Sequence, residues 1–194
     1  MKDHDDAAIS RHVRNVETLL EDRGIIDGAQ LDRILDEFLS RSEPANGQRI
    51  IARAWIDDAF RARLLTNANA AVAEFGYAAG GVQPQLLRVV ENTDDVHNVV
   101  VCTLCSCYPV MLLGPSPSWY KSEPYRSRVV RDPRAVLAEF GFVPPDDVEI
   151  RVWDASAETR YMVLPQRPAG TDALDEAQLL PLVTRNGMIG TAPV

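Results

Sequence analysis

The sequence predicts an α+β fold in which helices come first and strands and helices mix afterwards. Apolar residues recur at helical spacing through residues 10–76. β-Branched and aliphatic runs, which are typical of strands, begin at Leu86. From Asp132 onward helix and strand signals both occur, and this order of elements favours the α+β class. We expect a helical arm with its linker over residues 1–47 and a main domain over residues 48–194.

The arm is predicted to hold two amphipathic helices within residues 10–40. Ser10 is a suitable N-cap for the first helix, and Gly24 follows its last turn. The apolar positions on one face are Val13, Val16, Leu19 and Leu20 in the first helix and Leu31, Ile34, Leu35, Phe38 and Leu39 in the second. Residues 42–47, with the sequence SEPANG, are predicted to form a linker. The pattern leaves open whether the arm packs on its own domain or wraps a partner subunit.

The main domain is predicted to alternate between helices, strands and a long loop. Closely spaced prolines predict loop from Tyr108 to Pro124. Asp132 followed by Pro133 is typical of a helix start. The expected elements are a helical stretch at 48–76, strands at 86–90 and 98–102, a helix at 132–141, strands at 148–152 and 160–164 joined by a turn at 154–157, and a last helix at 175–183.

Composition and charge argue against several classes of function. The chain has 194 residues, a formal net charge of −8 and a pI of about 4.9. An acidic chain is a poor ligand for a nucleic-acid backbone or an anionic membrane surface. No apolar run approaches the roughly 20 residues of a membrane-spanning helix, and the amino-terminal MKDHDDAAIS lacks the apolar stretch of a signal peptide. We therefore expect a cytoplasmic protein that binds neither nucleic acid nor membrane.

The chemically informative feature is a cluster of three cysteines, Cys102, Cys105 and Cys107. An odd, tightly spaced set is not a disulfide framework, and its spacing allows the three sulfurs to meet at one point. Three thiolates do not complete a structural zinc site, which takes four ligands, and no histidine lies nearby in the sequence. The peptide nitrogens of Ser106 and Cys107 can serve as further ligands to a strongly Lewis-acidic metal, which suits trivalent iron or cobalt and leaves one position open. A redox pair or an adventitious zinc site is the plainer alternative.

The segment VCTLCSCYP, residues 101–109, resembles the metal claw of the nitrile hydratase α subunit. The resemblance covers about residues 48–192 and, less strictly, the helical arm. The other segments that resemble the family are residues 89–93, 97–101, 119–122, 126–134, 148–154 and 160–171. The resemblance implies a helical arm followed by a metal-binding catalytic domain with layered α-β-β-α architecture.

The resemblance also implies a reaction, the hydration of a nitrile to the corresponding amide. The metal ligands that it implies are the sulfurs of Cys102, Cys105 and Cys107 and the main-chain nitrogens of Ser106 and Cys107. Cys105 is expected as sulfinate and Cys107 as sulfenate, and the sulfenate oxygen is one of several candidate nucleophiles or bases. Thr103 matches the cobalt-type pattern, so non-corrin Co(III) is favoured over Fe(III). Gln83 occupies the position of a family glutamine near the metal, which makes it a candidate hydrogen-bond donor.

The partners that the resemblance implies are proteins and a small molecule. The family enzyme is an αβ heterodimer that can pair into a tetramer. Its β subunit, or a split version of it, is expected to supply arginines that hydrogen-bond the oxidised sulfurs. A maturation or activator protein is expected to load the metal. The substrate is expected to be a small-molecule nitrile.

The chain departs from the family directly after the claw. The family reads CSCYPWPVLGLPP, whereas Val110 and Met111 stand here in place of tryptophan and proline. The loss of a large rigid ring leads to the hypothesis that the pocket accepts an unusual, bulkier nitrile. The γ subunit of thiocyanate hydrolase shares the claw and is the main alternative. A metal-storage or maturation protein that carries cobalt on the claw is an alternative of another class, and a structural zinc module is a more distant one.

Several other residues have both a functional and a structural interpretation. Four arginines form either a solvated helix face or ion pairs at a subunit interface. They are Arg126, Arg128, Arg131 and Arg134. Asp154 and Arg160 match family positions near the subunit contact, but can equally be paired surface charges. Trp119 and Tyr120 are either core or pocket residues, and His97 is interpreted as structural.

Overall fold

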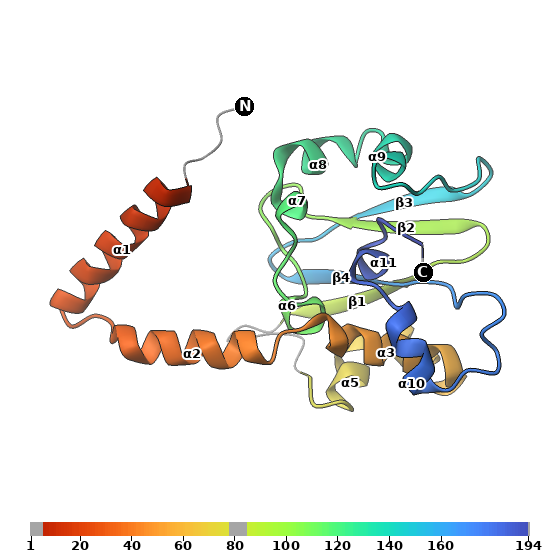
Figure 1. Cartoon of the computed structure of the whole chain (residues 1–194), viewed down its shortest axis with the longest axis horizontal. Helices are drawn as coiled ribbons and strands as arrows, with labels where there is room; N and C mark the ends of the chain where they lie inside the picture. Colours follow the sequence, from red (N-terminus) through yellow and green to blue (C-terminus); the bar gives the residue numbers. More distant parts are fainter. Residues whose placement is uncertain (1–5, 78–84, 194) are drawn as a thin grey trace. The chain divides into compact units, whose positions relative to one another are not determined.

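The computed structural model describes residues 6–77 and 85–193. The chain divides into two compact units between Arg41 and Ser42, ahead of the predicted boundary at residue 47 (Figure 1). Gln83 lies outside the described residues, so its predicted place near a metal is untested. Within the described part of the chain, no helix is both long enough and apolar enough to cross a membrane.

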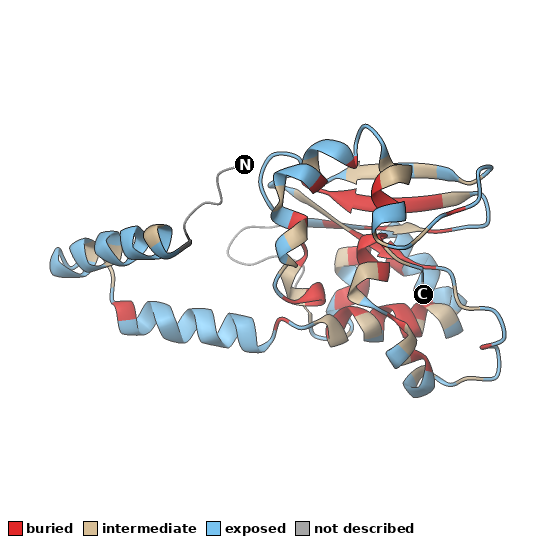
Figure 2. Ribbon diagram, turned by 45° about the horizontal axis from the view of Figure 1, so that its top comes forward, coloured by how far each residue is buried: buried red, intermediate tan, exposed pale blue. Residues whose placement is uncertain are grey.

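The first unit consists of two helices, α1 (Asp6–Asp22) and α2 (Gly28–Ser40), as the apolar spacing predicts. The capping role predicted for Ser10 is wrong, because α1 begins four residues earlier and Ser10 lies inside it. Asp27 caps α2 by accepting a hydrogen bond from the Gln30 amide at 3.0 Å. Most residues of both helices are exposed, including the predicted apolar stripes except Leu20, which is half-buried (Figure 2).

The second unit starts with three consecutive helices, which are α3 (Pro44–Ile56), α4 (Asp58–Thr66) and α5 (Ala68–Ala73). The linker predicted at residues 42–47 is therefore wrong, since most of it forms the first turn of α3. Its small polar residues are used for close packing instead. The Asn46 side chain donates to the Met111 carbonyl at 2.8 Å, and a Cβ on Gly47 would lie 2.6 Å from the Met188 sulfur.

In residues 6–77 and 85–193, four strands form two separate two-stranded parallel sheets. The strands are β1 (Leu86–Glu91), β2 (Val96–Val101), β3 (Glu149–Asp154) and β4 (Thr159–Leu164). β1 pairs with β4, and β2 pairs with β3. The turn predicted at residues 154–157 therefore leads from one sheet into the other and does not join two paired strands.

The β2–β3 register fixes where the cysteine segment leaves the sheet. Val101, the last residue of β2, lies opposite Asp154, the last residue of β3. The Ala155 amide donates to the Val101 carbonyl at 2.7 Å and extends the pairing by one bond. Cys102 therefore lies just beyond the end of the sheet, whereas the sequence places it inside the strand.

The stretch predicted as loop, residues 108–124, contains short helices. They are α6 (Val110–Leu113), α7 (Ser118–Lys121) and α8 (Glu123–Arg128). Three of the four prolines that indicated loop stand at helix starts, where a missing amide hydrogen costs little: Pro109 and Pro117 at N-caps and Pro124 in a first turn. The predicted helix after Asp132 is confirmed as α9 (Pro133–Glu139), with Asp132 as its cap.

The predicted last helix, at residues 175–183, is divided into α10 (Glu176–Leu179) and the 3₁₀ turn η1 (Leu180–Leu182). A further helix that the sequence does not predict, α11 (Arg185–Ile189), follows them. Gly190 ends α11 with a φ of 88°, and a Cβ there would lie 1.9 Å from the Asn98 carbonyl oxygen. Glycine is therefore required for α11 to approach β2 so closely.

The core of the second unit lies around the strand layer. Figure 1 shows the strands between α8 and α9 on one side and α3, α5 and α10 on the other. Buried residues concentrate in β2, in the second half of β4 and in the faces of the covering helices, whereas no residue of β3 is fully buried (Figure 2). The predicted α+β class is confirmed.

Candidate metal centre

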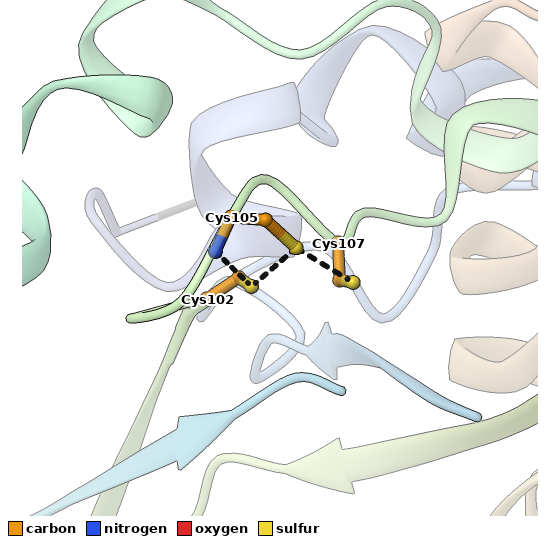
Figure 3. Close-up of side chains that lie close together, drawn as sticks. All are labelled: Cys102, Cys105 and Cys107. Atoms are coloured by element: carbon orange, nitrogen blue, oxygen red, sulfur yellow. Dashed lines mark hydrogen bonds between the residues drawn. The ribbon is translucent and has the colours of Figure 1, made fainter. Parts of the chain in front are cut away.

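Three cysteine side chains converge directly after β2. Cys102, Cys105 and Cys107 point toward one another in Figure 3, with all three sulfurs within 4.8 Å of one another. The sulfurs of Cys102 and Cys105 lie 3.5 Å apart, and those of Cys105 and Cys107 lie 3.3 Å apart. The Cys105 amide faces the same point and donates to the Cys102 sulfur at 3.3 Å. The spacing in the sequence therefore does bring the three sulfurs together.

The three thiols differ in exposure and in charge. Cys102 is fully buried, Cys107 is half-buried and Cys105 is exposed. Hydrogen bonds from the Cys107 and Cys102 thiols lower the pKa of Cys105 to about 7. Burial raises the pKa of Cys107 to about 12. The two shifts describe one arrangement, in which the exposed sulfur carries the negative charge and its half-buried neighbour keeps the proton.

The donor set fits a metal with octahedral preference. Two sulfurs bonded at right angles to one metal lie about 3.3 Å apart for bonds of about 2.3 Å, whereas tetrahedral geometry separates them by about 3.8 Å. The observed separations of 3.3 and 3.5 Å are closer to the first value. The main-chain amides of Ser106 and Cys107 lie near enough to the Cys105 sulfur to help lower the pKa of its thiol, so both nitrogens are close to the cluster. Thiolates combined with nitrogen donors suit cobalt or iron.

Side chains from the neighbouring strand and helices hold the cysteine loop. The Thr103 amide and hydroxyl both donate to the Asp154 carboxylate, at 2.9 and 2.6 Å. The Tyr120 hydroxyl, from α7, donates to the Cys107 carbonyl at 2.9 Å. Arg126, from α8, places one guanidinium nitrogen 3.2 to 3.5 Å from three successive loop carbonyls. The loop is therefore fixed by contacts on both sides of the cysteines.

The four arginines do not act as one surface. Arg128 pairs with Glu139 at 2.5 Å, and Arg134 donates to main-chain carbonyls between residues 144 and 148. Arg126 faces the cysteine loop, whereas Arg131 is exposed. Only the structure separates these roles, because the sequence shows four similar residues in one short segment.

Tyr120 belongs to the buried core, and Trp119 packs against that core, partly buried, and lines a small surface pocket. The Trp119 ring packs edge-on against Tyr125 and Phe140, with centroids 4.9 and 4.7 Å apart. Tyr120 is fully buried, yet its hydroxyl reaches the cysteine loop. The sequence gives no signal for that contact, because the two residues are far apart along the chain.

His97 and Arg160 lie in different surroundings. His97 is buried and bonds the Gly190 carbonyl and the Asn92 side chain, which agrees with its structural interpretation. Burial also lowers its pKa. Arg160 donates to the Ser156 carbonyl. Its positive charge partly offsets the burial that raises the pKa of Cys107. Among the described residues Arg160 is thus part of the loop environment and not a simple surface partner of Asp154.

Comparison with known proteins places these features in a family. The family model described as nitrile hydratase, alpha chain, matches residues 7–192. The α subunit of the low-molecular-weight cobalt-containing nitrile hydratase of Rhodococcus rhodochrous is 52% identical over 184 residues, covering 95% of this chain and 88% of the relative. The γ subunit of thiocyanate hydrolase from Thiobacillus thioparus is 40% identical over 189 residues, covering 91% and 76%. A double mutant of the iron-type nitrile hydratase from Comamonas testosteroni Ni1 has a TM-score of 0.89 at 39% identity, covering 97% of this chain and 91% of that chain.

An α+β domain with three thiols and two main-chain amides gathered in one loop defines a protein with a candidate thiolate metal site. The chain belongs to the nitrile hydratase α-chain family. Its relatives include subunits of hydro-lyase enzymes, and the resemblance noted from the sequence is confirmed, as are the fold and the enzyme class.

Proposed function

We propose that this chain is the metal-binding α subunit of an enzyme that hydrates a nitrile to the corresponding amide. The observation that carries the proposal is the convergence of three cysteine sulfurs and two amides in one loop of a chain of this family. Cys102, Cys105 and Cys107 would hold the metal through sulfur. Ser106 and Cys107 would also hold it through their main-chain nitrogens.

The proposed metal is non-corrin Co(III), with Fe(III) as the alternative. Thr103 matches the cobalt-type pattern, and the relative that is 52% identical is named as cobalt-containing. The structural neighbour named as iron-type is less similar in sequence, at 39% identity. Cobalt and iron suit the same thiolate and nitrogen donors, so the choice between them rests on Thr103 and on these relatives.

We propose that Cys105 matures to a sulfinate and Cys107 to a sulfenate, whereas Cys102 stays a thiolate. Oxygen atoms can be added only to a sulfur that an oxidant can reach. Cys105 is exposed and Cys107 is half-buried, but Cys102 has no exposed surface. The order of exposure therefore agrees with the assignment that the family resemblance implies.

The residues of this chain would supply position and a candidate proton acceptor. When bound, the metal contributes Lewis acidity that makes a nitrile carbon more electrophilic. The sulfenate oxygen proposed on Cys107 is the candidate nucleophile or base of this chain. Thr103, Tyr120 and Arg126 keep the loop in place through the contacts described above. Gln83 is proposed as a further hydrogen-bond donor near the metal.

The proposed partner is a β subunit, or a split version of it, in an αβ heterodimer that can pair into a tetramer. The apolar stripes of the arm support this proposal. Val13 and Leu19 of α1 are 58% and 55% exposed, and Ile34 of α2 is 57% exposed. Apolar rows of this length are typical of protein interfaces, so we propose that the β subunit covers them. A separate activator protein is proposed to load the metal.

Val110 and Met111 support the proposal that the nitrile is unusual or bulky. Val110 is half-buried against the core at the start of α6, where the family carries tryptophan. Valine is smaller than tryptophan, and we propose that this difference in volume is open to the substrate. Val110→Trp should therefore lower kcat/KM for bulky nitriles more than for small ones. An unchanged ranking across a wide nitrile panel, with small aliphatic nitriles preferred throughout, would refute this idea.

Turnover by the chain co-expressed with its β subunit and cobalt tests the proposed function. We expect amide formation from an organic nitrile at a kcat/KM above that for thiocyanate, and its loss in Cys107→Ser. The reverse preference would support thiocyanate hydrolysis, which the 40% identity to a γ subunit keeps as the second candidate. Easily released cobalt with no turnover of either substrate would indicate storage or delivery of the metal.

A further inference from the structure

One guanidinium group holds three consecutive carbonyls of the cysteine loop. Nη1 of Arg126 lies 3.5 Å from the Thr103 carbonyl oxygen, 3.2 Å from that of Leu104 and 3.3 Å from that of Cys105. Arg126 belongs to α8. The preceding residue of the same helix, Tyr125, donates its hydroxyl to the Val100 carbonyl of β2 at 2.7 Å. The guanidinium is therefore carried by an element that is itself fixed to the sheet.

The geometry of the peptide bond turns this contact into an orientation. In a planar trans peptide the carbonyl oxygen and the amide hydrogen point in opposite directions. Because the Leu104 and Cys105 carbonyls face Arg126, the amides of Cys105 and Ser106 face away from it. The Cys105 amide donates to the Cys102 sulfur at 3.3 Å, and the Ser106 amide lies near enough to the Cys105 sulfur to help lower the pKa of that thiol. The carbonyls thus line one side of the loop and the sulfurs and amide nitrogens line the other.

We propose that Arg126 is a positioning residue that keeps the Ser106 amide on the sulfur side of the loop, where the metal would be held. The proposal rests on the proposed function. Without Arg126 the Cys105–Ser106 peptide can rotate, because no other side chain among the described residues donates to these three carbonyls. A rotated peptide would turn its nitrogen away from the sulfurs and remove one ligand from the set.

Arg131 is the matched control for Arg126. Both residues line the same pocket of about 490 Å³, together with Thr103, Glu123, Ser127 and Val130. Arg131 is exposed, and its side chain makes no hydrogen bond or ion pair within the described part of the chain. Substitutions at both positions change the net charge equally, so a difference between them reports the contact with the loop carbonyls.

The first experiment uses the chain co-expressed with its β subunit and the proposed activator protein in cobalt medium, as wild type, Arg126→Met, Arg126→Lys and Arg131→Met. We measure the rate of cobalt release to a chelator and the sulfur-to-metal absorption band. Loss of a group that orients a metal ligand typically costs 10- to 100-fold in metal affinity. We therefore expect at least about tenfold faster release in Arg126→Met, an intermediate rate in Arg126→Lys and the wild-type rate in Arg131→Met. Equal release rates in all four proteins would overturn the proposal.

The second experiment needs no metal and uses the reduced, metal-free full chain. Amide hydrogen exchange of the peptide that spans residues 102–107 should be faster in Arg126→Met and Arg126→Lys than in Arg131→Met. Unchanged exchange would overturn the positioning role even if cobalt binds. Failure of the wild type to take up cobalt, with faster exchange in the Arg126 variants, would overturn the proposed function and retain Arg126 as the residue that orders the loop.

Discussion

Thr103 is anchored to Asp154 by two hydrogen bonds, from its amide at 2.9 Å and from its hydroxyl at 2.6 Å. Asp154 is the last residue of β3, which pairs with β2, the strand that ends at Val101. The carboxylate thus ties the start of the cysteine loop to the neighbouring strand. Cys102 lies between the sheet and this anchor, so its position is fixed on both sides.

Thr103→Val should weaken the anchor, whereas Thr103→Ser should retain it. Valine keeps the hydrogen bond from the main-chain amide to Asp154 but removes the hydrogen bond from the hydroxyl. Because the pair is exposed to solvent, we expect valine to lower the free energy of unfolding by only about 0.5–1 kcal/mol. Urea unfolding of the metal-free chain measures the difference. If the valine and serine variants unfold at the same midpoint, the hydroxyl bond contributes nothing.

Tyr120→Phe should loosen Cys107, whereas Tyr125→Phe should not. Each substitution removes one hydroxyl bond to a carbonyl, at Cys107 in the first case and at Val100 in the second. Both should lower the free energy of unfolding by about 1 kcal/mol. Tyr120→Phe should speed the release of cobalt to a chelator from the loaded complex more than Tyr125→Phe, because the Tyr125 hydroxyl acts on the loop only indirectly, through α8. Equal release from both variants would mean that the Tyr120 hydroxyl acts on stability alone.

Alkylation of the reduced, metal-free chain should be fastest at Cys105 and should depend on pH near neutrality. The thiolate is the reactive form, and the pKa of Cys105 is lowered to about 7 by its thiol neighbours. The rate at Cys105 should therefore rise as pH increases through about 7 and level off above it. Cys107, whose pKa is raised to about 12 by burial, should react slowly over the same range. Peptide mapping after brief iodoacetamide treatment gives both rates.

The control for this measurement is Cys105→Ser, which should remove the fast phase. A half-maximal rate near pH 8.5, the ordinary value for a thiol, would contradict the hydrogen-bonded arrangement of the three sulfurs. Fastest labelling at Cys102 would contradict its burial.

Polar substitution of the α2 stripe should weaken assembly with the β subunit and leave the second unit folded. Ile34→Ser with Leu35→Ser removes two exposed apolar side chains of the arm. The buried core of the second unit starts at Ile50 and contains no residue of the arm, so its thermal unfolding should not change. Co-purification with the β subunit measures assembly. The matched control is Arg33→Ser with Asp36→Ser. Equal assembly of the two double variants would mean that the α2 stripe does not contact the β subunit.

The cysteine site could be predicted from the sequence because its parts are close together along the chain. The spacing of Cys102, Cys105 and Cys107 allows their sulfurs to meet within one loop, and the structure shows that they do. The same holds for the helix that starts after Asp132, since capping is a local interaction. Periodicity likewise found both helices of the arm, because an apolar face repeats over a few turns.

The parts that could not be predicted depend on distant partners. Residues 42–47 have the composition of a linker. Position 47 nevertheless needs a glycine, because Met188 and Leu112 leave no room for a Cβ. β2 pairs with β3 although the two strands are far apart along the chain, and the sequence indicates only that both are strands. Arg126 and Tyr120 reach the loop from other helices, and nothing local distinguishes Arg126 from its neighbouring arginines.

Metal analysis with intact-mass measurement tests directly whether the three cysteines form a mature metal site. The sample is the chain co-expressed with its β subunit and the proposed activator protein in cobalt medium. We expect one cobalt per chain and the added mass of three oxygen atoms on the peptide from Cys105 to Cys107, two from a sulfinate and one from a sulfenate, with Cys102 unmodified. Zinc, or no metal with three free thiols, in the complex with its β subunit would contradict it.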